Sequence, residues 1–201
     1  GPGWAQAGMT PLRMYKSFMY EGGISATAIA WSPKLGIATG VKGAPIHVKD
    51  LAPTLYELAG AKHPGTEYRG KAVLPVTGKS MLGYLTGKQP AVHDANETMG
   101  WELGGRKALR KGDWKIVYSN KPWGTGEWEL YNLANDRAET NNLAAKNPEK
   151  LKEMVAEWPR YVAENGVIEI DNLAARPGYS NAGKYYEDLR FEAASKPRSA
   201  K

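Results

Sequence analysis

Apolar side chains recur at helical spacing from Pro148 to about Asn165, and this stretch constrains the fold more than any other part of the chain. Asn147 can cap the start of a helix, proline suits its first position, and Gly166 can end it. Its apolar face carries Leu151, Met154, Val155, Trp158, Tyr161 and Val162. Pro159 lacks the N–H that an unbroken helix needs, so we expect a kink or a restart there. Such a face must be buried against another layer.

The segments before this helix read as strands. Residues 97–103, 107–118 and 128–133 are rich in aromatic side chains and are separated by turns that contain glycine. Partial alternation within the second segment is typical of antiparallel strands with one covered face. We therefore expect a small α+β domain over residues 91–170, in which an antiparallel sheet packs on the long helix. Residues 171–201 are predicted to be an irregular tail.

The first half of the chain alternates short apolar runs with glycine-rich connections. Thr10 and Pro11 favour a helix from Pro11 to about Tyr20. The Gly22-Gly23 pair would end it, using the positive φ angles open to glycine. The apolar run from Ile24 to Trp31 predicts a buried strand. Helices are expected over residues 47–60 and 80–85.

Composition excludes several kinds of site. The chain has 201 residues, 42% of them hydrophobic, so it can bury a core as one domain or two small ones. It has no cysteine, which rules out disulfides, thiolate metal sites and cysteine nucleophiles. The net charge of +6 permits an anionic partner without requiring one. The chain shows no signal-peptide pattern and does not begin with methionine, so we expect a piece of a longer protein.

Two other candidate sites, a phosphate-binding loop and a histidine metal site, have weak support in the sequence. Gly78-Lys79-Ser80 resembles the end of a phosphate-binding loop, but Val73 stands where that loop needs glycine. The three histidines, His47, His63 and His93, lack the spacing of metal ligands.

A basic cluster of Arg106, Lys107, Arg110, Lys111 and Lys115 accompanies Trp114. These residues could form a nucleic-acid-binding face, although charged residues that face water on a half-covered sheet are the more ordinary interpretation.

Several ordered motifs carry a resemblance to a known family. They are Gly1-Pro2 with Trp4-Ala5-Gln6, Tyr15-Lys16 with Glu21-Gly22-Gly23-Ile24, His47-Val48 with Asp50-Leu51-Ala52-Pro53-Thr54-Leu55, Leu58-Ala59-Gly60, Gly78-Lys79-Ser80, Gly100-Trp101-Glu102-Leu103, Arg110-Lys111-Gly112-Asp113-Trp114-Lys115, Glu129-Leu130-Tyr131-Asn132-Leu133 with Asp136 and Glu139, and Trp158 with Tyr161. From about Gly1 to Val167 the chain resembles the C-terminal part of a type I sulfatase, in particular a bacterial arylsulfatase.

The resemblance implies an α/β fold of the alkaline-phosphatase type, of which residues 1–90 would be the C-terminal part. The small α+β domain (91–170) and the tail (171–201) would follow. It also implies hydrolysis of sulfate esters by a formylglycine, made from Cys or Ser in a Cys/Ser-x-Pro-x-Arg motif, beside a calcium ion held by Asp and Asn. Nearby Lys, His and Arg side chains would stabilise the sulfate oxygens.

Of these groups, the resemblance transfers one to this chain. Lys16 matches the family lysine before the Gly-Gly pair and is the expected catalytic and substrate-binding residue. No metal ligand is assigned, because the family's calcium-binding segments lie upstream. Ser195-Lys196-Pro197-Arg198 lacks the spacer of the formylglycine motif, and Ser25 and Thr27 stand where the family usually has Arg and Pro.

We therefore expect the parent protein to hydrolyse aryl or alkyl sulfates, with calcium and formylglycine supplied by an upstream segment. The chain alone is expected to be inactive, since it lacks both groups. The open alternatives are a non-catalytic anion- or nucleic-acid-binding module and a scaffold. Expected partners are a small sulfate ester and the upstream part of the same protein, with no membrane and with nucleic acid less favoured. A bacterial cytoplasm or periplasm is the expected compartment.

We also expect exposed apolar surface at residues 24–31 and 51–58, where missing strands would pack, and therefore self-association of the fragment.

Overall fold

The computed structural model describes residues 1–121 and 123–169. The chain forms two compact units, one made of Gly1–Ser25 and the chain from Thr98 onward, the other of Ala26–Glu97. These units interleave along the chain, whereas the sequence-based ranges 1–90 and 91–170 are consecutive; those ranges remain predictions. The predicted tail, 171–201, lies outside the described residues.

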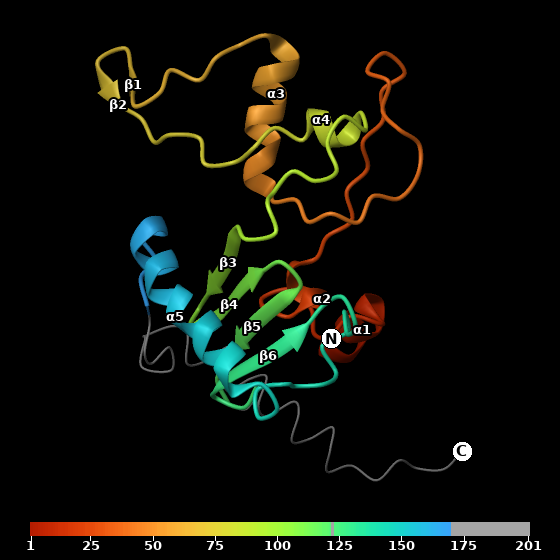
Figure 1. The fold of residues 1–201 in the computed structure, drawn as a ribbon, viewed down its shortest axis with the longest axis vertical. Helices are drawn as coiled ribbons and strands as arrows, with labels where there is room; N and C mark the ends of the chain where they lie inside the picture. Colours follow the sequence, from red (N-terminus) through yellow and green to blue (C-terminus); the bar gives the residue numbers. More distant parts are fainter. Residues whose placement is uncertain (122, 170–201) are drawn as a thin grey trace. The chain divides into compact units, whose positions relative to one another are not determined.

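The first unit is built on a four-stranded antiparallel sheet in the order β3-β4-β5-β6 (Figure 1). The strands are β3 (Thr98–Leu103), β4 (Arg106–Lys111), β5 (Trp114–Tyr118) and β6 (Trp128–Asn132). Gly104 and Gly105, at φ +60° and +77°, form the tight turn between β3 and β4. The predicted segment 107–118 divides into β4 and β5 at Gly112, whose φ is +59°. The antiparallel sheet expected from the sequence is confirmed, with four strands.

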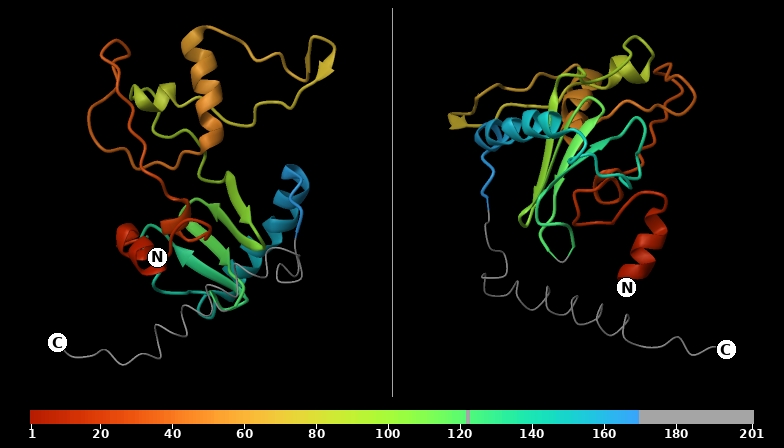
Figure 2. Two further views of the ribbon diagram at one scale, coloured as in Figure 1. Left: turned by 180° about the vertical axis from the view of Figure 1, so that it is seen from behind. Right: turned by 60° about the horizontal axis from the view of Figure 1, so that its bottom comes forward.

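Both faces of this sheet are covered, so the expectation of one covered face is wrong. On one face, Leu109, Ile116 and Leu130 pack with Met154 and Trp158. These last two residues come from α5 (Pro148–Asn165), which lies along that face in the two views of Figure 2. The helix ends at Asn165, before Gly166, whose φ is +63°, and it does not restart at Pro159.

The opposite face is covered by residues from the start of the chain. Ala108, Val117 and Tyr131 pack there against Phe18, Met19 and Tyr20, which are at most 5% exposed. Neighbouring residues in β4 and β5, such as Ile116 and Val117, are therefore both buried, on opposite faces.

The expected helix over residues 11–20 is absent. The first unit instead has helices α1 (Pro2–Met9) and α2 (Glu21–Ile24), with a loop between them. Met14 and Ser17 have φ angles of +63° and +82°, which a right-handed helix does not allow. Burial of the loop's apolar residues against the sheet outweighs the local preference for helix.

The second unit contains a 3₁₀ helix η1 (Val48–Asp50), α3 (Leu51–Ala59), a small hairpin of β1 (Glu67–Tyr68) and β2 (Lys71–Ala72), and α4 (Leu82–Leu85). The helices expected at 47–60 and 80–85 are confirmed, and Gly60 at φ +61° ends α3. Within the described chain, no helix is long and apolar enough to cross a membrane.

The expectation of a buried strand from Ile24 to Trp31 is wrong. Ile24 ends α2, the following residues adopt no regular structure, and Ile29 and Trp31 are 91% and 83% exposed. A strand needs a partner for its backbone groups, and the described residues pair none with this segment. The predicted exposure of apolar residues is confirmed here and on α3, where Leu51, Leu55 and Leu58 are 42–63% exposed.

Candidate functional site

Lys16 lies exposed in a turn of the connection between α1 and α2. We call residues 13–20 the Lys16 loop. Met14 and Ser17, on either side of Lys16, hold positive φ angles that cost non-glycine residues about 1–3 kcal/mol each. No hydrogen bond or ion pair joins the Lys16 side chain to the residues that the structure describes. Its position therefore depends on how the rest of the loop is held, at its two ends and at the Ser17 carbonyl, which accepts a hydrogen bond from Arg106.

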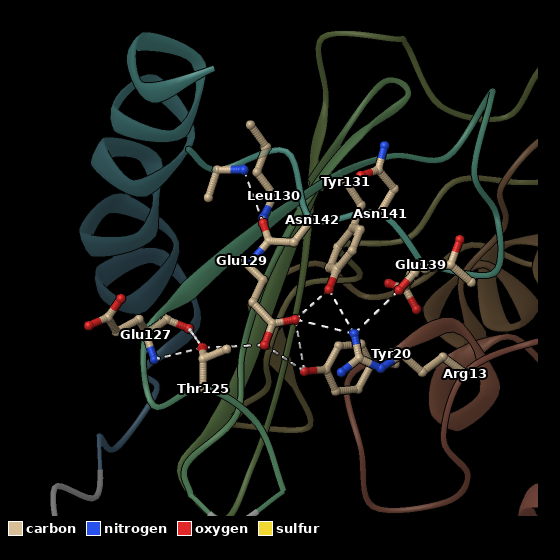
Figure 3. Close-up of polar contacts among 12 residues, drawn as sticks. Arg13, Tyr20, Thr125, Glu127, Glu129, Leu130, Tyr131, Glu139, Asn141 and Asn142 are labelled. Carbon is tan, nitrogen blue, oxygen red and sulfur yellow. Dashed lines mark hydrogen bonds and ion pairs between the residues drawn. The ribbon is translucent and has the colours of Figure 1, made fainter. Parts of the chain in front are cut away.

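The first end is held by Arg13 (Figure 3). Its guanidinium donates to the Tyr131 hydroxyl at 2.8 Å and to the backbone carbonyl of Glu139 at 3.3 Å. The same group lies 3.4 Å from Oε2 of Glu129 and packs over the ring of Tyr20, 4.3 Å from its centroid. We call Arg13, Tyr20, Glu129 and Tyr131 the Glu129 cluster.

Glu129, on β6, is buried and accepts hydrogen bonds from several hydroxyls. Tyr20 donates at 3.1 Å and Thr125 at 3.3 Å, while Tyr131 makes a short bond to Oε2 (Figure 3). Burial, with help from Glu129, raises the pKa of Tyr20 to about 12, and the same causes raise the pKa of Tyr131. Both hydroxyls therefore keep their protons at neutral pH and act as donors.

The second end is held by a buried group of charges, Glu21, Lys115 and Glu139, which we call the Glu139 cluster. Nζ of Lys115, a fully buried residue of β5, lies 2.9 Å from Oε1 of Glu21 and 2.8 Å from Oε1 of Glu139. The backbone N–H of Glu21 donates to Oε2 of Glu139 at 2.6 Å. Burial raises the pKa of Glu139, although Lys115 opposes the shift.

Gly22 and Gly23 close the loop through close backbone contact. A Cβ on Gly22 would lie 2.1 Å from the Met14 carbonyl oxygen, and one on Gly23 would lie 2.0 Å from that of Phe18. The N–H of Gly22 donates to the Arg13 carbonyl at 2.9 Å. Neither glycine has a positive φ, so the expectation that this pair supplies a left-handed turn is wrong.

The basic residues of β4 and β5 are engaged with the protein rather than arrayed along an open face. The two arginines donate hydrogen bonds to backbone carbonyls, Arg106 to that of Ser17 and Arg110 to that of Gly112. The two lysines form ion pairs, Lys107 with Glu169 and Lys111 with Glu157. Lys115 is buried, so its interpretation as a water-facing charge is wrong. Lys115 shares a sheet face with Val117. Two adjacent apolar residues, Ile116 and Val117, point to opposite faces of a strand, so this pair in the sequence could have indicated that both faces of β5 are covered.

Asp50 is a second buried polar centre, in the unit of residues 26–97. Nε2 of His93 lies 2.7 Å from its Oδ2, which also accepts the backbone N–H of His47 at 2.7 Å. Oδ1 accepts the backbone N–H of Lys79 at 2.9 Å. Burial raises the pKa of Asp50, but these hydrogen bonds outweigh burial and lower it overall. The convergence of two histidines on Asp50 was not predicted from the sequence, while His63 lies elsewhere, against Tyr56.

The residues present do not fit the calcium that the resemblance implies. The structurally described part of the chain contains no group of three His, Asp or Glu side chains that could hold a metal ion. The carboxylates of the Glu139 cluster are taken up by an ammonium group and a backbone N–H. We therefore assign no metal ligand to these residues.

Comparison with known proteins identifies relatives that are about three times as long. An uncharacterized sulfatase of Schizosaccharomyces pombe is 40% identical over 168 residues, covering 84% of this chain and 30% of the relative. A protein of Formosa agariphila named sulfatase is 31% identical over 150 residues, covering 69% of this chain and 26% of that protein. The chain thus spans less than a third of the curated relatives it matches. No protein-family model matches it.

Among solved structures, the complex of Ps i-CgsB with k-i-k-neocarrahexaose has a similar fold. The TM-score is 0.58 over 94% of this chain and 39% of that one, at 23% sequence identity. The similarity in sequence to two sulfatases and the shared fold lead to one conclusion. The chain belongs to the sulfatase family and corresponds to its C-terminal portion.

Proposed function

We propose that this chain is the C-terminal portion of an enzyme that hydrolyses aryl or alkyl sulfate esters, and that Lys16 contacts the sulfate group. The observation that carries the proposal is the placement of Lys16. It is an exposed cation in a turn whose two ends are bound to buried charged clusters. An exposed lysine without a local partner is ordinary, but one presented by a loop held this firmly is suited to binding an anion.

The chemistry asked of Lys16 is electrostatic. Negative charge on the oxygens of a sulfate ester increases as the ester bond breaks, and an ammonium group already in place stabilises that charge. The stabilisation is largest where water is excluded, because the effective dielectric constant is low there. Loss of one such group commonly lowers kcat by about 10²–10³-fold.

The remaining machinery is assigned to the part of the parent protein outside this chain. The sequence has no cysteine and no Ser-x-Pro-x-Arg run, so it offers no formylglycine precursor. We place the formylglycine, the calcium ion and the missing strands of an alkaline-phosphatase-like domain in the upstream segment. In this arrangement the sheet and α5 form the small α+β domain of the enzyme.

The first test compares Lys16→Met with Lys121→Met in the full-length parent protein. Lys121 is also exposed and belongs to the same unit, so it controls for loss of a surface charge. We expect hydrolysis of p-nitrophenyl sulfate to fall about 10²–10³-fold in Lys16→Met and to stay within about twofold in Lys121→Met. Equal activity of the two variants would contradict the role of Lys16. Metal-dependent release of nitrophenol by the isolated chain would contradict its predicted inactivity.

A further inference from the structure

We propose that the Glu139 cluster is a positioning device for Lys16, and that Glu139 holds both ends of the Lys16 loop in the register that catalysis needs. This inference rests on the proposed role of Lys16 in binding sulfate. It assigns a function to Lys115 and Glu139, which do not approach the ester themselves.

Glu139 contacts the loop at both ends. Its backbone carbonyl accepts a hydrogen bond from the Arg13 guanidinium, where the loop begins. Its carboxylate accepts the N–H of Glu21, directly after the loop ends. Glu139 itself has a φ of +56°, an uncommon value for a non-glycine residue, and this conformation is compatible with serving both contacts at once.

Lys115 ties this arrangement to the sheet. Its ammonium lies between the carboxylates of Glu21 and Glu139, 2.9 and 2.8 Å away, and is fully buried. The lysine belongs to β5, an inner strand of the sheet that is paired on both sides. The end of the loop is thus bound to a rigid strand through a charged hydrogen bond from Lys115 to Glu21 and through the ion pair of Lys115 with Glu139. A charged hydrogen bond is directional, whereas apolar contacts are not.

The free-energy cost of burying these charges indicates that they serve to position the loop rather than to stabilise the fold. Removing charged groups from water costs free energy that their attraction often does not recover, so apolar residues would stabilise the same space as well or better. Burial raises the pKa of Glu139, in keeping with that cost. What charged groups add is a single geometry, and the residue whose geometry they determine is the exposed cation of the loop.

The first measurement is hydrogen exchange of residues 13–22 in this chain. Glu139→Ala removes the carboxylate contacts with Lys115 and with the Glu21 N–H. Glu139→Gln keeps an acceptor for the Glu21 N–H but loses the charge and the second oxygen, which faces Lys115. Glu157→Ala is the matched control, since Glu157 pairs with Lys111 of β4, away from the loop. We expect exchange in the loop to accelerate at least tenfold in Glu139→Ala and less in Glu139→Gln, with a smaller change in α5 and in β5, where Lys115 loses one of its two partners. Exchange as slow as in the control would overturn the proposal.

The second measurement is a double-mutant cycle in the full-length protein with p-nitrophenyl sulfate. We expect Glu139→Ala to lower kcat at least tenfold and Glu139→Gln to lower kcat by less. KM should change less than kcat in both variants. In the Lys16→Met background, Glu139→Ala should lower kcat by less than twofold, because the residue to be positioned is gone. A purely structural role would instead give the same loss in both backgrounds, and that result would overturn the proposal.

The two measurements separate the two claims. Unchanged exchange together with an inactive Lys16→Met variant refutes the positioning role and leaves the proposed function standing. Faster exchange together with a fully active Lys16→Met variant refutes the proposed function, and the positioning role falls with it.

Discussion

Gly22 leaves no room for a side chain, because the loop folds back upon it. A Cβ there would lie 2.1 Å from the Met14 carbonyl oxygen and 2.4 Å from that of Arg13, and both atoms belong to the backbone. Gly8, in α1, has nothing within 4 Å of its Cβ position. Comparing glycine-to-alanine substitutions at these two positions therefore separates the cost of the close backbone contact from the general effect of replacing glycine on stability.

We predict that Gly22→Ala destabilises the unit containing the sheet by about 1–3 kcal/mol, as overpacking does in protein cores. Gly8→Ala should be neutral or stabilise by up to about 1 kcal/mol, since alanine favours helix. Urea denaturation followed by tryptophan fluorescence measures both. If Gly22→Ala unfolds at the same urea concentration as Gly8→Ala, the backbone contact does not constrain this position.

At the scale of the element, the start of the helical segment η1–α3 depends on Asp50. Its carboxylate accepts the N–H of His47, forming a capping box with the His47 side chain, and contacts His93 as well. Its pKa lies below the ordinary value of 3.8, so the folded state binds fewer protons than the unfolded state in this range. The resulting stabilisation is present above the ordinary pKa and is lost as the pH falls through the folded one.

We predict that protection of the α3 amides from hydrogen exchange, corrected for intrinsic rates, falls as the pH is lowered from 6 to about 3. Asp50→Asn should be less protected at pH 6 and should show a flatter pH profile. Asp94→Asn is the control, because the exposed carboxylate of Asp94 accepts a local hydrogen bond, from the N–H of Asn96. A wild-type profile in Asp50→Asn would show that another group governs the helix.

At the scale of the whole molecule, the isolated chain exposes several large apolar side chains to water. Leu51, Leu55 and Leu58 form a stripe along α3, and Ile29 and Trp31 are almost fully exposed in the same unit. Exposed stripes of this kind mark surfaces that pack against other protein. In the proposed parent enzyme, the upstream segment would cover them.

We predict that the isolated chain self-associates, with a weight-average mass that rises above 22.0 kDa as concentration increases. Replacing both Leu55 and Leu58 by Glu should reduce the association, whereas Lys62→Glu, an exposed change in the same unit, should not. Sedimentation equilibrium measures the mass. A constant monomer mass for the wild-type chain would contradict the prediction.

Local patterns in the sequence determined the elements that depend on neighbouring residues. The periodicity and terminal signals of the sequence predicted a helix from Pro148 to about Asn165, which is α5, and glycine at position 60 marked the end of α3. The ordered motifs placed the chain in the sulfatase family and singled out Lys16. The helices and the family are confirmed, because helical periodicity, terminal glycines and family motifs can be read within one stretch of chain. The role of Lys16 stays a prediction.

The tertiary structure alone decided which charges are buried and which apolar residues are not. Lys115 lies beside Glu21, which is 94 positions away in the chain. The strand expected at residues 24–31 finds no partner strand among the residues that the structure describes. Burial of a charge and formation of a strand both depend on groups brought together by folding, so no local pattern specifies them. The sequence therefore singled out Lys16 as a candidate, and the fold revealed the buried charges that hold its loop.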